Sequence, residues 1–197
     1  MIDVGPHYRL GPPGTPPLAP RTTLLLEAGK GFGDGRHETT QLCLLALAYL
    51  MRIVPRIGPR PVRVLDFGAG NGVLSIAAAC AGATVDAVEI DATALAEARH
   101  NAHLNNVAER IDLREALGSP ETPYDVVVAN IQLVVLLAHA PVLGSCLAPA
   151  GHLVLSGLVS TDVPAIFAEY RPRLPGHRAE VYERGEWRAI LFSPSKS

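Results

Sequence analysis

Hydrophobic residues along the chain form two patterns, short apolar runs of strand length and longer segments with helical spacing. The runs that predict strands cover residues 62–67, 84–89, 110–114, 124–130 and 151–157. The segments that predict helices cover residues 41–51, 73–81, 92–105 and 131–147. Because strands and helices alternate, and the run over 124–130 is almost continuously apolar, the pattern predicts a parallel sheet buried between helices.

The last part of the chain departs from this alternation. A helix is predicted over 161–174, and two further strands, 178–183 and 186–192, face each other across Arg184 and Gly185. So short a connection requires the two strands to be antiparallel. We therefore predict the α/β class, with a mixed sheet of about seven strands wound by right-handed crossovers.

Residues with special helix preferences refine two of the helices. Thr39 or Thr40 can cap the helix over 41–51, whose apolar residues cover more than one face and indicate burial against a sheet. Pro141 is expected to break the helix over 131–147 near its middle.

The first 20 residues have a different composition from the rest of the chain. They carry six of the 17 prolines and three of the 18 glycines, which excludes a helix or a central strand there. We expect a proline-rich leader or extended arm over 1–20, followed by a single domain over 21–197.

Length, charge and cysteine content limit the class of protein. With 197 residues and 48% hydrophobic content, the chain fits one domain with a continuous core. A net charge of -2, a pI near 6.4 and the lack of a basic run disfavour direct nucleic-acid binding. Three cysteines, far apart in apolar segments, fit reduced thiols in a cytoplasmic protein. The sequence contains no span long enough for a membrane and no signal peptide, and it leaves the oligomeric state open.

A glycine-rich turn follows the strand over 62–67. Its glycines, Gly68, Gly70 and Gly72, are spaced G-x-G-x-G, which lets the backbone approach a ligand and leaves N–H groups free at a helix start. Glu89 ends the next strand about 20 residues later, the spacing at which a dinucleotide fold places an acid on a ribose. The pattern predicts a nucleoside-binding site.

Three polar groups are expected at one edge of the sheet: the loop over 31–40, the glycine turn with Glu89, and Asn130. All three lie at or above the carboxyl ends of strands, where open α/β sheets bind ligands. The G-x-G-x-G spacing, with Asp66 two residues before the first glycine, resembles class I S-adenosylmethionine-dependent methyltransferases more than nicotinamide dehydrogenases. The resemblance implies a Rossmann-like sheet with helices on both faces and S-adenosylmethionine as cofactor; a dehydrogenase remains the rival.

Longer blocks of sequence make this resemblance more specific. The blocks that resemble the family that modifies ribosomal protein L11 (PrmA) cover residues 31–40, 64–78, 125–131, 156–157 and 185–187. The first block, Phe-Gly-x-Gly-x-His-x-Thr-Thr, is far more specific than a glycine motif. Asp34 and Arg36 depart from the usual family pattern, and we expect a proline-rich leader in place of the family's amino-terminal substrate-binding domain.

The resemblance implies which residues contact the cofactor. The second threonine of the first block, the first glycine of the turn, the strand-end acid and the asparagine of the Ala-Asn-Ile block do so in that family. The cofactor site expected from the sequence consists of Phe32, Gly33, Thr40, Asp66, Gly68, Gly70, Glu89 and Asn130.

Methyl transfer to nitrogen requires an uncharged amine in line with the methyl group. The ordinary pKa of a lysine amine is about 10.4, so the site must favour its neutral form. We expect Asn130 to orient an N–H of the amine through its side-chain carbonyl. The second catalytic candidate, His37, is either a proton acceptor or a residue that orders the loop. Asp34 either pairs with an amine or turns the loop, and Trp187 is expected to pack in the last hairpin.

The predicted function is an S-adenosylmethionine-dependent N-methyltransferase acting on a protein amine, either a lysine or an amino terminus. The alternatives are a methyltransferase for a small-molecule amine, an NAD-dependent oxidoreductase and a cofactor-binding subunit without catalysis. No metal is expected, because His100 and His103 have no acid or cysteine in a metal-binding pattern beside them. The loop over 29–35 is expected to be a mobile lid.

Overall fold

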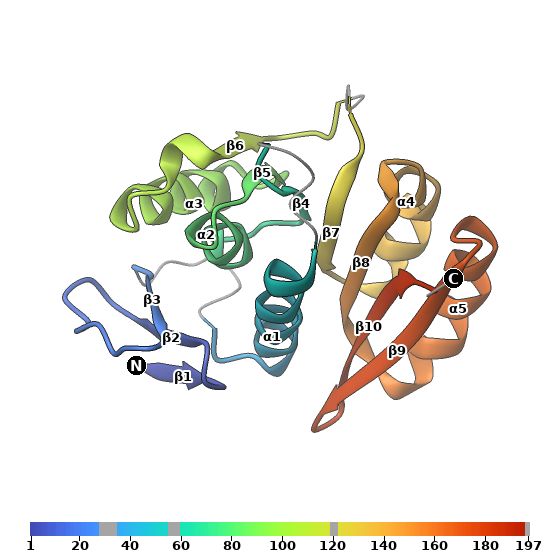
Figure 1. Cartoon of the computed structure of the whole chain (residues 1–197), viewed down its shortest axis with the longest axis horizontal. Coiled ribbons are helices and arrows are strands. Elements are labelled where there is room, and N and C mark those ends of the chain that lie inside the picture. The colour runs from blue at the N-terminus through green and yellow to red at the C-terminus, as the bar shows by residue number, and fades with distance from the viewer. Residues whose placement is uncertain (28–34, 55–59, 119–121, 196–197) are drawn as a thin grey trace.

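The computed structural model describes residues 1–27, 35–54, 60–118 and 122–195. Its centre is a seven-stranded sheet in the order β6-β5-β4-β7-β8-β10-β9 (Figure 1). The five strands from β6 to β8 are parallel, and β10 runs antiparallel to both of its neighbours. The strands are β4 (Arg63–Phe67), β5 (Thr84–Val88), β6 (Ile111–Arg114), β7 (Tyr124–Asn130), β8 (Leu147–Val159), β9 (His177–Arg184) and β10 (Trp187–Pro194). The predicted mixed sheet with an antiparallel last hairpin is confirmed.

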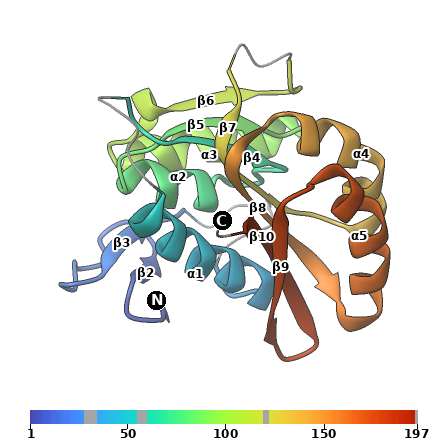
Figure 2. The same ribbon diagram turned by 45° about the vertical axis from the view of Figure 1, so that its right-hand side comes forward.

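Helices cover both faces of this sheet (Figure 2). The helices are α1 (Glu38–Ile53), α2 (Val73–Cys80), α3 (Ala92–Leu104), α4 (Leu133–Ser145) and α5 (Val163–Tyr170), with short 3-10 turns η1 (Ala108–Arg110), η2 (Ser160–Asp162) and η3 (Arg171–Arg173). The core accordingly has two parts, one shared with α1, α2 and α3 and the other with α4 and α5. Alternate residues of β7 enter each part: Val126 and Val128 enter the first, Val127 and Ala129 the second. Burial on both sides explains why this strand is almost entirely apolar.

The first 25 residues are folded, which corrects the expected arm or leader. They form a separate sheet of β1 (Ile2–Val4), β2 (Tyr8–Gly11) and β3 (Thr22–Leu25). All six prolines fall in the connections, so the strands keep their N–H groups. Leu25 exchanges hydrogen bonds with the side chain of Asn105 at the end of α3, over 2.8 and 2.7 Å. Because its buried side chains share a core with α1 and α2, this sheet belongs to the same packing unit.

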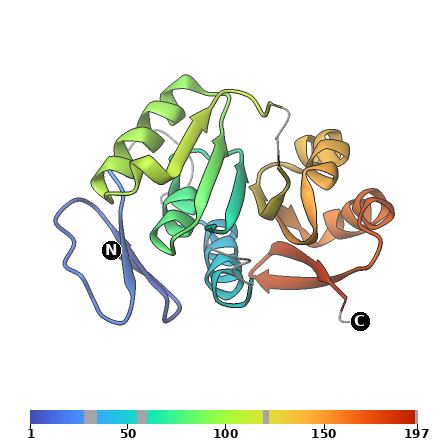
Figure 3. The same ribbon diagram turned by 45° about the horizontal axis from the view of Figure 1, so that its top comes forward.

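Helix α1 lies between the small sheet and the main sheet (Figure 3). Leu45 lies against Gly5, next to β1, and ten of the 16 residues of α1 are buried. Packing on two sides explains the apolar residues on more than one face of α1. The helix begins earlier than predicted, because His37 and neither threonine is its N-cap.

Helix α4 continues through Pro141, so the predicted break is wrong. Leu136, Ala140 and Leu143 are fully buried against the sheet on either side of the proline. This packing holds the helix together where the proline removes a backbone donor.

Within the described residues, no helix combines the length and the hydrophobicity needed to cross a membrane.

Candidate active site

A cleft of about 650 Å³ opens at the carboxyl ends of β4, β5 and β7. Six of the residues named from the sequence line it: His37, Thr40, Gly68, Gly70, Glu89 and Asn130. They come from the N-cap and first turn of α1, the glycine turn and two strand ends, so the topology brings together segments that are far apart in the sequence. Phe32 and Gly33, Asp34 and most of the loop over 29–35 lie outside the described residues.

The glycine turn is tightly held by its own hydrogen bonds. The N–H groups of Gly68 and Ala69 both donate to the carbonyl of Val88, over 2.8 and 2.9 Å. Gly70 donates to Glu89 over 2.9 Å, and Gly72 donates back to Ala69. Four N–H groups of the turn, those of Gly68, Ala69, Gly70 and Gly72, are thus engaged within the protein and are not free for a ligand.

Glu89 is held in place by backbone donors on both sides. One carboxylate oxygen accepts from Gly70 and the other from Asp91, the latter over 3.0 Å. Each oxygen keeps a second lone pair, and Glu89 lines the cleft. A fixed carboxylate with two such acceptors suits the adjacent hydroxyls of a ribose.

Asp66 lies behind the glycine turn and does not line the cleft. It is fully buried, and Ser75 donates to its Oδ2 over 2.6 Å. Burial raises the pKa of Asp66 from 3.8 to about 6, although the hydrogen bonds from Ser75 oppose this shift. Its Oδ1 has no hydrogen-bond partner among the described residues. Asp66 therefore contacts Ser75 of α2 behind the glycine turn and does not face a ligand in the cleft.

Asn130 presents an acceptor that the described protein residues do not use. Its Nδ2 donates to Oγ1 of Thr40 over 3.4 Å. Its Oδ1 is shielded from solvent and has no hydrogen-bond partner in the part of the chain that the structure describes. A buried carbonyl oxygen without a donor is costly, so a ligand that supplies an N–H or O–H would be stabilised here.

His37 and Trp187 form the wall beyond Asn130. Their ring centroids are 4.6 Å apart at an interplanar angle of 63°. Nδ1 of His37 lies 2.7 Å from Oγ1 of Thr39 and 3.4 Å from the backbone N of Thr39. This geometry favours the loop-ordering interpretation of His37, because Nδ1 serves the start of α1.

Several cleft residues could not be recognised from the sequence. Trp187, expected only to pack in the hairpin, lines the cleft, as do Phe67, Val135 and His139. Phe67 and His139 also contact each other, with ring centroids 5.0 Å apart. Two signals were available for Phe67 and Trp187: an aromatic residue at a strand boundary, and a place in the blocks 64–78 and 185–187 that resemble the family. The sequence gives no comparable signal for the two α4 residues.

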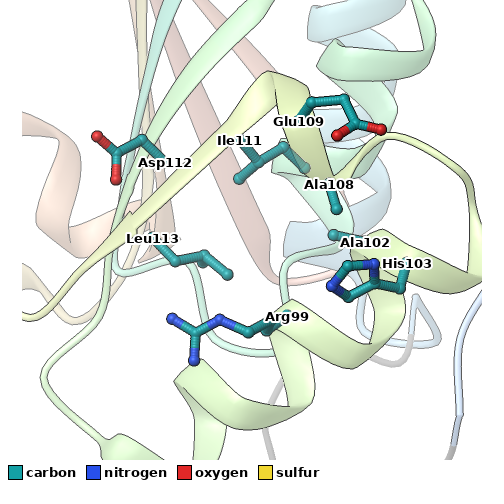
Figure 4. Close-up of a pocket in the computed structure, with 8 residues that line it drawn as sticks. All are labelled: Arg99, Ala102, His103, Ala108, Glu109, Ile111, Asp112 and Leu113. Carbon is teal, nitrogen blue, oxygen red and sulfur yellow. The ribbon is translucent and has the colours of Figure 1, made fainter.

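A second hollow, of about 350 Å³, lies between α3 and β6 (Figure 4). Arg99 and His103 of α3 and Glu109 of η1 lie at this hollow. It shares no lining residue with the cleft. Among the described residues, no group of three His, Cys, Asp or Glu side chains is placed to hold a metal ion.

A family model for "Ribosomal protein L11 methyltransferase (PrmA)" matches residues 15–194. The chain belongs to this family. A PrmA relative from Trichlorobacter lovleyi, named ribosomal protein L11 methyltransferase, is 38% identical over 87% of this chain and 56% of its own length. One from Teredinibacter turnerae with the same name is 36% identical over 96% of this chain and 61% of its own. The chain therefore spans about three fifths of the length of these relatives.

Solved structures agree with the PrmA assignment. The crystal structure of a ribosomal protein L11 methylase from Lactobacillus delbrueckii subsp. bulgaricus superposes with a TM-score of 0.83 at 28% identity. The match covers 99% of this chain and 98% of that chain. An O-methyltransferase from Bacillus cereus, solved with SAH, has a TM-score of 0.64 at 13% identity and shows the shared fold. The fold is the Rossmann-like class I methyltransferase fold.

Proposed function

We propose that this PrmA chain is an S-adenosylmethionine-dependent N-methyltransferase that methylates an amine of a protein. The observation that carries the proposal is the shielded, unpartnered Oδ1 of Asn130 beside the cofactor cleft. An attacking amine has an N–H to donate to this oxygen. Family membership supports the reaction class.

The cofactor side of the cleft fits S-adenosylmethionine better than NAD. Glu89 offers two fixed acceptors for ribose hydroxyls, while the N–H groups from Gly68 to Gly70 are engaged within the protein and are not offered to a pyrophosphate. When bound, the cofactor supplies a methyl group already activated on a sulfonium. The protein then has to hold the acceptor in line and exclude water.

The acceptor side favours a neutral amine in a fixed position. Oδ1 of Asn130 orients one N–H, and the rings of His37 and Trp187 shield the nitrogen from water. Desolvation by such walls favours the uncharged form of an amine. Nδ1 of His37 faces Thr39 at the start of α1, so the ring is held in place as one wall beside the amine.

The acceptor is proposed to be a lysine or an amino terminus on a ribosomal protein. The support is the name shared by the relatives, ribosomal protein L11 methyltransferase. Because the chain covers only part of their length, its substrate and its cytoplasmic location are inferences from this likeness. A small-molecule amine is the alternative acceptor.

Incubation with methyl-labelled S-adenosylmethionine and either ribosomal protein L11 or a panel of amines tests this proposal. We expect label in the protein and a loss of about 100-fold for Asn130→Ala, because the amine is no longer oriented. His103→Ala, a change outside the cleft, should keep the normal rate. Label only in a small product would show that the acceptor is a small-molecule amine. Label in neither the protein nor a small product would contradict the proposal that the chain is a methyltransferase.

A further inference from the structure

His139 lies on α4 with one ring nitrogen already used. Its Nδ1 is 2.9 Å from the backbone carbonyl of Val135, one helical turn earlier. A carbonyl oxygen can only accept, so Nδ1 must carry the proton. In the neutral ring, Nε2 is then an acceptor, and it has no partner among the described residues. The helix has therefore fixed the tautomer of a histidine that lines the cleft.

The contacts of His139 show which part of the cleft it lines. Its ring contacts Phe67, at the end of β4. In the sheet, β4 lies between β5, which Glu89 follows, and β7, which ends at Asn130, while Trp187 at the start of β10 lies three strands away from β4. His139 is thus beside the strand ends near which Glu89 would hold a ribose. The end of the cleft that Trp187 lines is further along the sheet.

The walls at this end are apolar and offer room for a flat group. Phe67, Val88 and Val135 line it together with Ile90, which is 88% exposed. An isoleucine this exposed beside a cleft is a free apolar surface for a ligand. His139 adds one acceptor to these walls. A purine with an exocyclic amino group matches both features, because its faces are apolar and its amino group donates.

We propose that His139 is a specificity-determining residue that accepts a hydrogen bond, through Nε2, from the exocyclic amino group of the cofactor's 6-aminopurine. The inference rests on the proposed function, since it takes the ligand to be S-adenosylmethionine. A 6-oxo purine presents an oxygen at the same place. Two acceptors would then face each other, so the site disfavours the 6-oxo base.

Calorimetric titration with S-adenosylhomocysteine and with its 6-oxo analogue, S-inosylhomocysteine, tests this role. We expect the wild type to prefer the adenosyl ligand by about tenfold or more. His139→Leu should weaken adenosyl binding about 3- to 10-fold, the usual effect of one lost hydrogen bond. It should leave inosyl binding equal or stronger, so the preference falls.

Three further variants separate this role from packing. His139→Phe keeps an aromatic contact with Phe67 but has no acceptor, so it should behave like the leucine variant. His139→Gln supplies an acceptor oxygen and should restore part of the preference. His103→Leu, on α3 outside the cleft, should change nothing.

The results distinguish a failure of this inference from a failure of the proposed function. If the wild type binds S-adenosylhomocysteine but His139→Leu keeps the full preference, or weakens both ligands equally, the inference is overturned and the function stands. If the folded wild type binds neither ligand, both are overturned. Thermal unfolding of each variant confirms that the compared proteins are folded.

Discussion

A side chain on Gly68 would overlap with Cγ2 of Ile131. Gly68 has a φ of +82°, in the left-handed region, so both its backbone and its surroundings require glycine. Ile131 directly follows Asn130 in the chain. The contact between Gly68 and Ile131 therefore links the glycine turn to the part of the cleft that contains Asn130. The two ends of the site are therefore packed against each other.

Gly68→Ala is expected to lower the free energy of unfolding by about 2–4 kcal/mol, from backbone strain and overlap with Ile131. It should also weaken binding of S-adenosylhomocysteine, because the turn must shift. Gly82→Ala is the matched control: its φ is +93°, but a Cβ there meets nothing within 4 Å. That variant should lose only about 1 kcal/mol in urea unfolding. Equal losses in the two variants would contradict the packing argument.

Glu89→Ala is expected to weaken S-adenosylhomocysteine binding about 10- to 100-fold. The change removes the ribose acceptors and also releases Gly70 and Asp91, whose N–H groups Glu89 holds. Calorimetric titration measures the effect. Glu109→Ala, at the second hollow, is the control and should bind normally. Tight binding of NAD by the wild type would contradict the proposed cofactor and favour the dehydrogenase alternative.

Asp66→Asn is expected to stabilise the protein at neutral pH relative to the wild type. The pKa of Asp66 is raised from 3.8 to about 6 by burial, so the folded state binds this proton more tightly than the unfolded state. The cost of the buried charge is absent below about pH 4, grows as pH rises, and is complete above about pH 6. The difference between 3.8 and about 6 corresponds to about 3 kcal/mol.

Urea unfolding of the wild type and Asp66→Asn at several pH values checks this. The advantage of the variant should increase between about pH 4 and pH 7 and then level off. An advantage that does not change with pH would show that the carboxyl is not titrating in the folded protein.

His37→Asn and His37→Ala distinguish the two roles proposed for this residue. Asparagine is a good N-cap, so it should keep the start of α1, whereas alanine should cost about 1 kcal/mol of stability. If His37 orders the loop, the asparagine variant should retain much more activity than the alanine variant. Equal and severe loss in a folded asparagine variant would favour the proton acceptor.

The sequence allowed the sheet, the turn and the strand-end residues to be predicted, because strand ends in an open α/β sheet converge by topology alone. Glu89 and Asn130 were found in this way. Phe67 and His139 were missed because their meeting depends on how α4 packs under β4, which periodicity does not reveal. The proline count of the first 20 residues was misleading for a physical reason, since prolines limit only their own positions and left two short segments free to pair.

The packing of Gly35 is another feature that the sequence does not reveal. A Cβ on this residue would overlap with Leu10 of β2, so its replacement by alanine disturbs packing against the small sheet. A test of the predicted lid should therefore change Gly33 and leave Gly35 intact. The lid itself stays a prediction.

The position of α1 between two sheets has a practical consequence for anyone shortening the chain. A truncated protein that starts at residue 21 would lose β1 and β2 and present the flank of α1 around Leu45 to water. Freshly exposed apolar surface of this kind promotes self-association. Such a fragment is expected to precipitate during expression, and its lack of activity would say nothing about whether residues 1–20 take part in methylation.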